Sequence, residues 1–86
     1  MEPAAIERTI RDAWPEAEVE VAGDGRHFDL VVVTDRFAGL RKIRRQQMVY
    51  ALLGDAIARG ELHALNIHPF TPAERDERAG GSWSGS

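Results

Sequence analysis

The chain has 86 residues, with 11 basic and 14 acidic side chains and a formal net charge of −3 at neutral pH. This length suits one small domain, and 43% apolar with 29% charged residues is ordinary for a globular protein. The sequence has no apolar run of membrane-spanning length and no N-terminal signal segment, so we expect a cytoplasmic protein with no membrane partner. Cysteine is absent, which excludes disulfides, a thiolate nucleophile and a cysteine metal site from this chain.

The first third of the chain predicts a helix followed by two strands. Pro3 suits the first turn of a helix, an apolar stripe at helical spacing follows, and Pro15 ends the helix because the residue before a proline leaves the α region. Residues 18–21 alternate polar and apolar, and the Asp-Gly pair at 24–25 is typical of a hairpin turn. Residues 27–34 have apolar side chains on both faces, so we expect a central strand. The helical stripe consists of Ile6, Ile10, Ala13 and Trp14.

A long helical region is expected over residues 40–59. At about 100° per residue it has an apolar face and a basic face, and Met48, Val49 and Leu52 fall beneath the basic one. A single straight helix could not bury these three side chains, so we expect a break near Met48–Ala51 that gives two helices joined by a tight turn. The apolar face consists of Ile43, Tyr50, Leu53 and Ile57, and the basic face of Arg41, Lys42, Arg44 and Arg45.

The last third predicts a strand and a short helix. Gly60 ends the second helix of the long region, and residues 63–70 form a third strand. Residues 71–74 combine an N-cap threonine, a proline at the first helical position and a glutamate three residues after the cap, which marks a helix that ends near Gly80. We therefore expect one α+β domain over residues 1–79, with a three-stranded mixed sheet, helices packed on one face and the order α-β-β-α-α-β-α. Residues 80–86 form a disordered Gly/Ser-rich tail.

The residue types argue against an enzyme. All serines lie in residues 82–86, and the sequence has no phosphate loop, metalloprotease motif or nucleophile elbow. By their position alone, His27, His63 and His68 are more often structural residues near strand ends than metal ligands.

The charge is distributed unevenly along the chain. Residues 36–45 carry five basic and no acidic side chains, residues 1–35 sum to −6, and residues 46–86 sum to −2. A block of one sign is most often a solvated helix face, but it can also be a docking surface. The residues alone leave both readings open.

Four segments of the chain together resemble one protein family. They are VAGDGRHF (Val21–Phe28), RFAGLRKIRRQQMVYALL (Arg36–Leu53), LHALNI (Leu62–Ile67) and FTPAE (Phe70–Glu74). In this order and spacing they span roughly residues 4–76 and resemble the BolA family, specifically its IbaG-like (YrbA-like) bacterial branch. Gln46 stands where BolA proper more often has a histidine, which favours the IbaG-like branch.

The resemblance implies a fold, partners and site residues. The family's fold resembles a type II KH domain and includes a helix-turn-helix-like pair. Its members partner monothiol glutaredoxins and share a glutathione-bound 2Fe–2S cluster, so an isolated chain would carry no cofactor and is expected to be monomeric. The recurrent histidine ligand is matched here by His63 and a second ligand by His27, while His68 lies outside the pattern. Imidazole in place of thiolate lowers the charge of a cluster, raises its potential and binds only when deprotonated.

The competing hypothesis is nucleic-acid binding. KH-like folds read single strands, and a helix-turn-helix-like pair that carries the basic face could contact phosphates. However, the Gly-x-x-Gly loop of type II KH domains is absent, because Gly39 stands alone, and the domain is net acidic. We therefore rank a cluster adaptor first, nucleic-acid binding second and an enzyme last.

Overall fold

The computed structural model describes residues 2–23, 27–62 and 64–80. Apart from one short 3-10 helix, the elements follow the predicted order. They are α1 (Pro3–Ala13), β1 (Glu18–Gly23), β2 (His27–Val33), η1 (Asp35–Phe37), α2 (Lys42–Leu52), α3 (Gly54–Ala58), β3 (Ala64–Phe70) and α4 (Pro72–Gly80). None of the helices in these ranges is long and apolar enough to cross a lipid bilayer.

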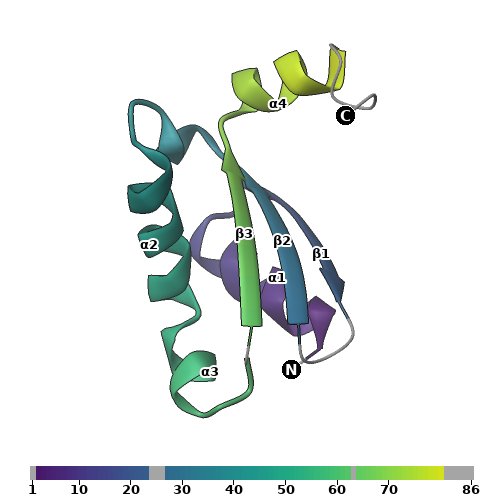
Figure 1. Ribbon diagram of the computed structural model, residues 1–86, viewed down its shortest axis with the longest axis vertical. Coiled ribbons are helices and arrows are strands. Elements are labelled where there is room, and N and C mark those ends of the chain that lie inside the picture. The colour runs from purple at the N-terminus through teal and green to yellow at the C-terminus, as the bar shows by residue number, and fades with distance from the viewer. Residues whose placement is uncertain (1, 24–26, 63, 81–86) are drawn as a thin grey trace.

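The sheet is mixed and has the order β1-β2-β3, so β2 is central as predicted (Figure 1). β1 and β2 pair antiparallel, with Gly23 opposite Phe28, and the predicted turn at 24–25 between them lies outside the described residues. β2 and β3 pair parallel, from His27 beside Ala64 onward. A parallel pair needs a long crossover, and η1, α2 and α3 supply it here.

The main core lies between the sheet and the helices α1–α3. Phe28, Leu30 and Val32 of β2 point to this side and are buried, as the alternation along the strand requires. Ile6 and Ile10 of α1 belong to the same cluster, and Figure 1 shows α1 behind the sheet with α2 beside β3. Trp14 and Leu62 are also in this cluster, whereas Ala13, predicted in the apolar stripe, is exposed.

The helix α4 does not belong to the layer of α1–α3, so the prediction that the helices pack on one face holds for three of the four. Glu18, Val33 and Phe70 form one row across the three strands, on the side opposite the main core. Val33 is nevertheless buried, and Arg75 of α4 reaches across to the carboxylate of Glu18. α4 therefore covers the end of the second face. It also extends to Gly80, the first residue of the predicted tail, and residues 81–86 lie outside the described part.

The long helical region is divided, but not where the sequence indicated. The break is at Leu53, which has φ −99° and ψ 9° and directly precedes Gly54, rather than at Met48–Ala51. Gly60 follows the second helix with a φ of +76°, as expected for a glycine after a helix C-terminus. Val49 is fully buried, as predicted. Met48 and Leu52 are only half-buried.

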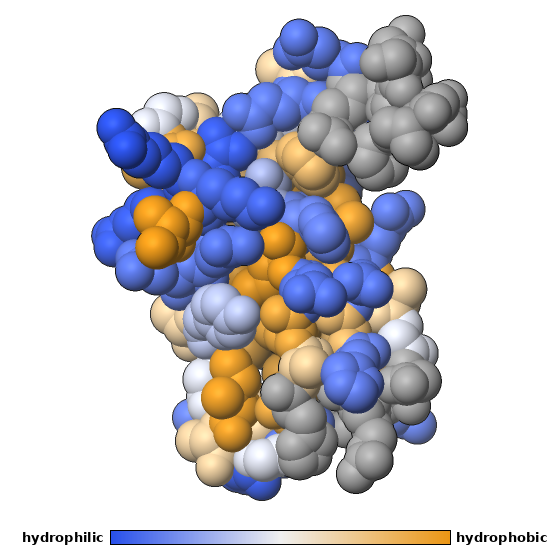
Figure 2. All heavy atoms as spheres, viewed as in Figure 1, coloured by the Kyte–Doolittle hydropathy of each residue, from blue (hydrophilic) through white to orange (hydrophobic). Residues whose placement is uncertain are grey.

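The predicted apolar face of this region is mostly exposed. Leu53 is in the core, but Ile43, Tyr50 and Ile57 are 67%, 42% and 38% exposed. Figure 2 shows apolar atoms among hydrophilic ones over this part of the molecule. For Ile43 the cause is Arg45, which is buried instead of solvated. Because residues two apart in a helix point in nearly opposite directions, an inward Arg45 turns Ile43 outward.

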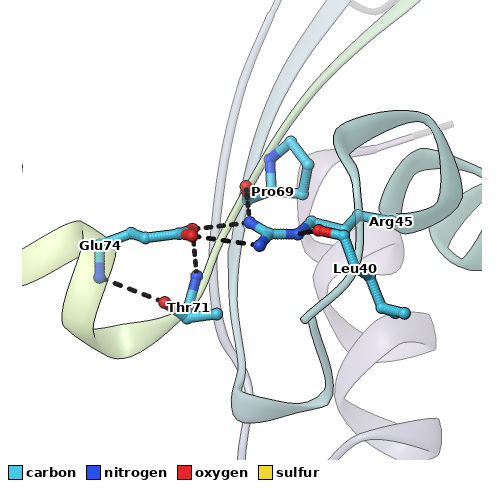
Figure 3. A network of polar contacts seen from close by, with 5 residues as sticks. All are labelled: Leu40, Arg45, Pro69, Thr71 and Glu74. Carbon is cyan, nitrogen blue, oxygen red and sulfur yellow. Dashed lines mark hydrogen bonds and ion pairs between the residues drawn. The ribbon is translucent and has the colours of Figure 1, made fainter. Parts of the chain in front are cut away.

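Arg45 can be buried because each nitrogen of its guanidinium donates a hydrogen bond within the protein (Figure 3). Nε donates to the carbonyl of Leu40 at 2.9 Å, and Nη1 donates to the carbonyl of Pro69 at 3.3 Å. Nη1 and Nη2 also bind the two carboxylate oxygens of Glu74, at 2.6 and 3.1 Å. Arg45 thus joins α2 to the loop before it, to the end of β3 and to α4.

Glu74 also caps the N-terminus of α4, which confirms the predicted capping signal. Its carboxylate accepts a hydrogen bond from the Thr71 N–H at 3.0 Å, and the Glu74 N–H donates to Thr71 Oγ1 at 3.2 Å. The side-chain hydrogen bonds from Arg45, followed by the one from the Thr71 N–H, lower the pKa of Glu74 to about 2.

Two further side chains of α2 also bind β3. Tyr50 Oη donates to the carbonyl of Leu65, and Gln46 Nε2 donates to the carbonyl of Ile67, each at 3.3 Å. Arg45 binds the carbonyl of Pro69 in the same way. Side chains of α2 therefore bind three alternate carbonyls on the free edge of β3, those of residues 65, 67 and 69.

The first prediction compares two large aliphatic residues of the same helical region. We expect Leu53→Ala to lower the free energy of unfolding by about 2–5 kcal/mol, because it leaves a cavity in the core. Ile43→Ala should change it by no more than about 0.5 kcal/mol, because Ile43 is exposed. Denaturant unfolding of both variants measures the difference. Equal losses would contradict the orientation of α2 described here.

The second prediction concerns Glu74. We expect Glu74→Gln to destabilise the fold by about 1–2 kcal/mol at neutral pH, a modest value because the Glu74 side chain is 44% exposed. Since the folded-state pKa is lowered from 4.5 to about 2, this stabilisation is present above pH 4.5 and is lost as the pH falls toward 2. Denaturant unfolding across this range should therefore show the variant and the wild type converging in acid. Glu77→Gln, an exposed change on the same helix, is the control, and a constant difference from pH 7 to 2 would refute the assignment.

Candidate functional site

The predicted metal ligands belong to the end of the sheet where β2 and β3 begin. His27 is the first residue of β2 and is exposed. Its register partner on β3 is Ala64, the residue that follows His63 in the sequence. His63 itself lies outside the described residues, so the structure gives its neighbours and not its side chain. The starts of the two strands lie side by side at this end of the molecule (Figure 1).

Gly23 fixes the backbone near His27, and the sequence analysis did not identify this role. A Cβ atom at Gly23 would lie 2.3 Å from the carbonyl oxygen of His27 and 2.7 Å from a ring carbon of Phe28. Only a residue without a side chain allows β1 to approach β2 so closely at this point. The backbone position of His27 therefore requires a glycine at position 23.

His68 lies on the same face of the sheet as His27 but further along the strands. It is in register with Val31, four residues along the strand from His27, which corresponds to about 13 Å. Its Nε2 is 3.8 Å from Asp29 Oδ1, and Asn66 Nδ2 donates to the same oxygen at 3.1 Å. Among the side chains that the structure describes, no group of three or more possible ligands is arranged to hold a metal ion.

The basic block of residues 36–45 divides into structural and surface side chains. Arg45 is buried, and Arg36 forms two hydrogen bonds with Glu16, at 2.7 and 3.2 Å, and lies 5.7 Å from the ring centroid of Trp14. Thr34 Oγ1 also donates to Glu16, and the bonds from Arg36 and then Thr34 lower the pKa of Glu16 to about 2. These two arginines are therefore committed to the fold, and Arg45 drops out of the predicted binding face.

The three remaining cations gather at the start of α2. Arg41 is the N-cap residue, Lys42 and Arg44 lie in the first turn, and all three are exposed. The helix start has no side-chain cap bond and no acidic residue in its first turn. Because a helix N-terminus already carries partial positive charge, the three cations make this end strongly attractive to anionic groups. None of them has an ion-pair partner among the described residues.

Comparisons with known proteins agree with this architecture. The family model described as BolA-like protein matches residues 5–74. The acid stress protein IbaG of Escherichia coli K12 is 39% identical over 83 residues, which cover 94% of this chain and 99% of that protein. The DNA-binding transcriptional regulator BolA of the same strain is 34% identical over 79 residues, covering 80% of this chain and 74% of that protein.

A solved structure gives the same result for the fold. The bolA protein homologue from Coxiella burnetii superposes with a TM-score of 0.79 at 31% identity, covering 88% of this chain and 97% of that one. Sequence segments, sheet topology and relatives all coincide, and the family match spans most of the chain. This protein belongs to the BolA family.

Proposed function

We propose that this protein is an adaptor that partners a monothiol glutaredoxin and contributes histidine ligation to a shared, glutathione-bound 2Fe–2S cluster. Its role would lie in iron–sulfur cluster assembly, trafficking or stress response. The observation that supports this most directly is the exposed His27 at the start of β2, beside the strand that His63 precedes, in a chain without cysteine.

The side chains of this protein could supply some, but not all, of the ligands of a 2Fe–2S cluster. A 2Fe–2S cluster takes four ligands, usually thiolates, and this chain has histidine imidazoles but no thiolate to offer. The remaining ligands must then come from the partner and from glutathione. Two hydrogen-bonded neighbours hold β2 at this end, because Phe28 pairs with Gly23 on one side and Leu65 on the other. The chain can therefore present His27 from a rigid backbone.

The same chemistry makes the ligation sensitive to acid. An imidazole binds iron only when it is deprotonated, and its ordinary pKa is close to neutral. The Escherichia coli relative is named acid stress protein IbaG, which is consistent with such a response. When bound, the cluster would supply the redox-active iron, and the chain would supply the ligands and their position.

The third prediction tests ligation by each histidine. On mixing with a monothiol glutaredoxin and glutathione, His63→Ala should abolish the change in visible absorption and circular dichroism that marks the mixed cluster. His27→Ala should reduce it. His68→Ala should leave it unchanged, because His68 lies about 13 Å from the strand starts and faces Asp29. A normal spectrum for His63→Ala, in a protein with normal thermal unfolding, would disprove the assignment.

Nucleic-acid binding is the second candidate, favoured by the three exposed cations at the start of α2. A relative is named a DNA-binding transcriptional regulator, and it is 34% identical to this chain. Three surface cations are nevertheless few, since Arg45 is held by Glu74 and the chain is net acidic.

The fourth prediction uses salt to separate the two functions. If Arg41, Lys42 and Arg44 all contacted phosphates of a single strand, the log–log salt slope would be about −2, and Arg44→Gln would reduce its magnitude by about 0.7. We instead expect weak binding of DNA and RNA at physiological salt, as measured by fluorescence anisotropy. Sub-micromolar, sequence-selective binding that survives His63→Ala would reverse the ranking of the two functions.

A further inference from the structure

The two outer edges of the sheet differ in how they are covered. On β3, side chains of α2 bind the outward carbonyls of residues 65, 67 and 69. β1 forms the opposite margin of the sheet. Figure 1 shows no helix or strand beside the outer edge of β1, because α1 passes behind the sheet. The backbone of β1 is therefore the one to test for unused hydrogen-bonding groups.

The hydrogen-bond pattern of the sheet shows which groups of β1 point outward. The Thr34 N–H donates to the carbonyl of Phe70, so even-numbered residues of β2 direct their backbone groups to β3 and odd-numbered ones to β1. In the β1–β2 register, these odd-numbered residues face the even-numbered residues of β1. The N–H and C=O groups of Val19 and Val21 therefore point away from the sheet, and no described residue binds them. Val21 is the more accessible of the two, since Val19 is only 5% exposed.

A shallow hollow lies along this edge, and its lining is acidic. Three carboxylates line it, those of Glu7 on α1, Glu20 on β1 and Asp29 on β2, together with aliphatic side chains of the two strands. Glu7 is paired with Arg11 at 3.2 Å. Glu20 has no ion pair or side-chain hydrogen bond with any described residue, and Asp29 accepts a bond from Asn66 but is still 63% exposed. Two carboxylates of the hollow are thus available to cations.

We propose that the outer edge of β1 binds a basic, extended segment of a partner protein as a fourth strand of the sheet. The backbone of the added strand would bond with the outward groups of Val21, and its side chains would alternate between the two faces. In an antiparallel ladder, the residue opposite Glu20 would belong to a non-hydrogen-bonded pair, in which the two side chains lie closest. A lysine or arginine at that position would therefore meet the carboxylate of Glu20. This binding would not require the cluster.

A second cation fits two residues further along the added strand. Ala22 and Asp29 are register partners, and both side chains point to the same face of the sheet as Glu20. Because Ala22 carries only a methyl group, a long basic side chain opposite it would pass over it and reach Asp29. The residue between the two cations would point to the other face, where the half-buried Val21 packs against the core and favours an apolar neighbour. The edge thus fits an alternating basic–apolar–basic segment.

Other occupants fit this edge less well. Antiparallel pairing of two copies of β1, with Val19 of one bonded to Val21 of the other, would place the two Glu20 carboxylates directly opposite each other. Like charges at such positions are destabilising. An acidic strand would form the same backbone bonds but would meet the same repulsion. A nucleic-acid strand would be repelled by the three carboxylates of the hollow.

The fifth prediction tests the charges of this edge. The probe is a fluorescein-labelled peptide with the central segment Thr-Lys-Val-Lys-Thr, and its binding to the complete chain is measured by fluorescence anisotropy. We expect saturable binding, which Glu20→Lys should weaken at least tenfold because it replaces attraction by repulsion. Asp55→Lys makes the same charge change at an exposed site on α3 and should leave the dissociation constant within twofold.

A change in the peptide backbone distinguishes an added strand from simple attraction between charges. N-methylation of the central valine of the peptide keeps both cations but removes the N–H that would bond the Val21 carbonyl, so binding should weaken at least tenfold. Amide hydrogen exchange supplies a direct readout on the chain. The exchange of the Val21 N–H should slow when the unmodified peptide binds, whereas that of Glu20, whose N–H already faces β2, should change less.

Three results would overturn the proposal. If the peptide shows no saturable binding at millimolar concentration, the acidic side chains only protect the edge against aggregation. If the N-methylated peptide binds equally well, or Asp55→Lys weakens binding as much as Glu20→Lys, the contact is general attraction between charges. If the chain forms a dimer in sedimentation that Val21→Pro dissociates, the edge belongs to a second copy, because this substitution removes an N–H that points outward and spares the pairing with β2.

Discussion

The buried Arg45 guanidinium is the contact on which the arrangement of the helices depends. An arginine keeps its proton at any accessible pH, so its guanidinium is buried at little cost only when its nitrogens find hydrogen-bond partners. Glu74 and the carbonyls of Leu40 and Pro69 provide those partners from three other segments of the chain. Removing one partner would leave part of this buried charge uncompensated, which destabilises the fold.

A line of side-chain contacts extends from this arginine through the fold. The Arg45 guanidinium lies 5.8 Å from the ring centroid of Phe37, and Phe37 meets Trp14 edge to face at 5.7 Å. Arg36 covers the other ring and is held in turn by Glu16. Two arginines that look like surface charges in the sequence thus bracket a pair of core aromatics. Each of these arginines binds a carboxylate, Glu16 or Glu74, whose pKa is lowered to about 2.

Local signals predicted most of the elements, and long-range contacts account for what they missed. The helix from Pro3, the central strand β2 and the Thr71–Glu74 cap each depend on residues close together in the chain. The orientation of α2 depends on a bond between residues 29 apart, which no periodicity can reveal. The pattern therefore placed Arg45 on the surface and Ile43 in the core, and both assignments were wrong.

The candidate site was predictable only in part, for a similar reason. The fold pairs Arg36 with Glu16 and Arg45 with Glu74. Only these contacts show which cations of the basic block remain available at the start of α2. The need for Gly23 follows from the close approach of β1 to His27, a consequence of strand pairing. Ligation by His63 and His27 stays a prediction that comes from the family resemblance, because residue 63 lies outside the described part of the chain.

The bonds from α2 to the free edge of β3 have a consequence for how this protein behaves at high concentration. An open strand edge is a template on which another chain can add a strand and begin a growing sheet. Here Tyr50, Gln46 and Arg45 occupy the carbonyls at alternate positions along that edge. Pro69, the residue at the last of these positions, has no N–H to offer. Stacking of molecules through this edge is therefore blocked by side chains that are already part of the fold.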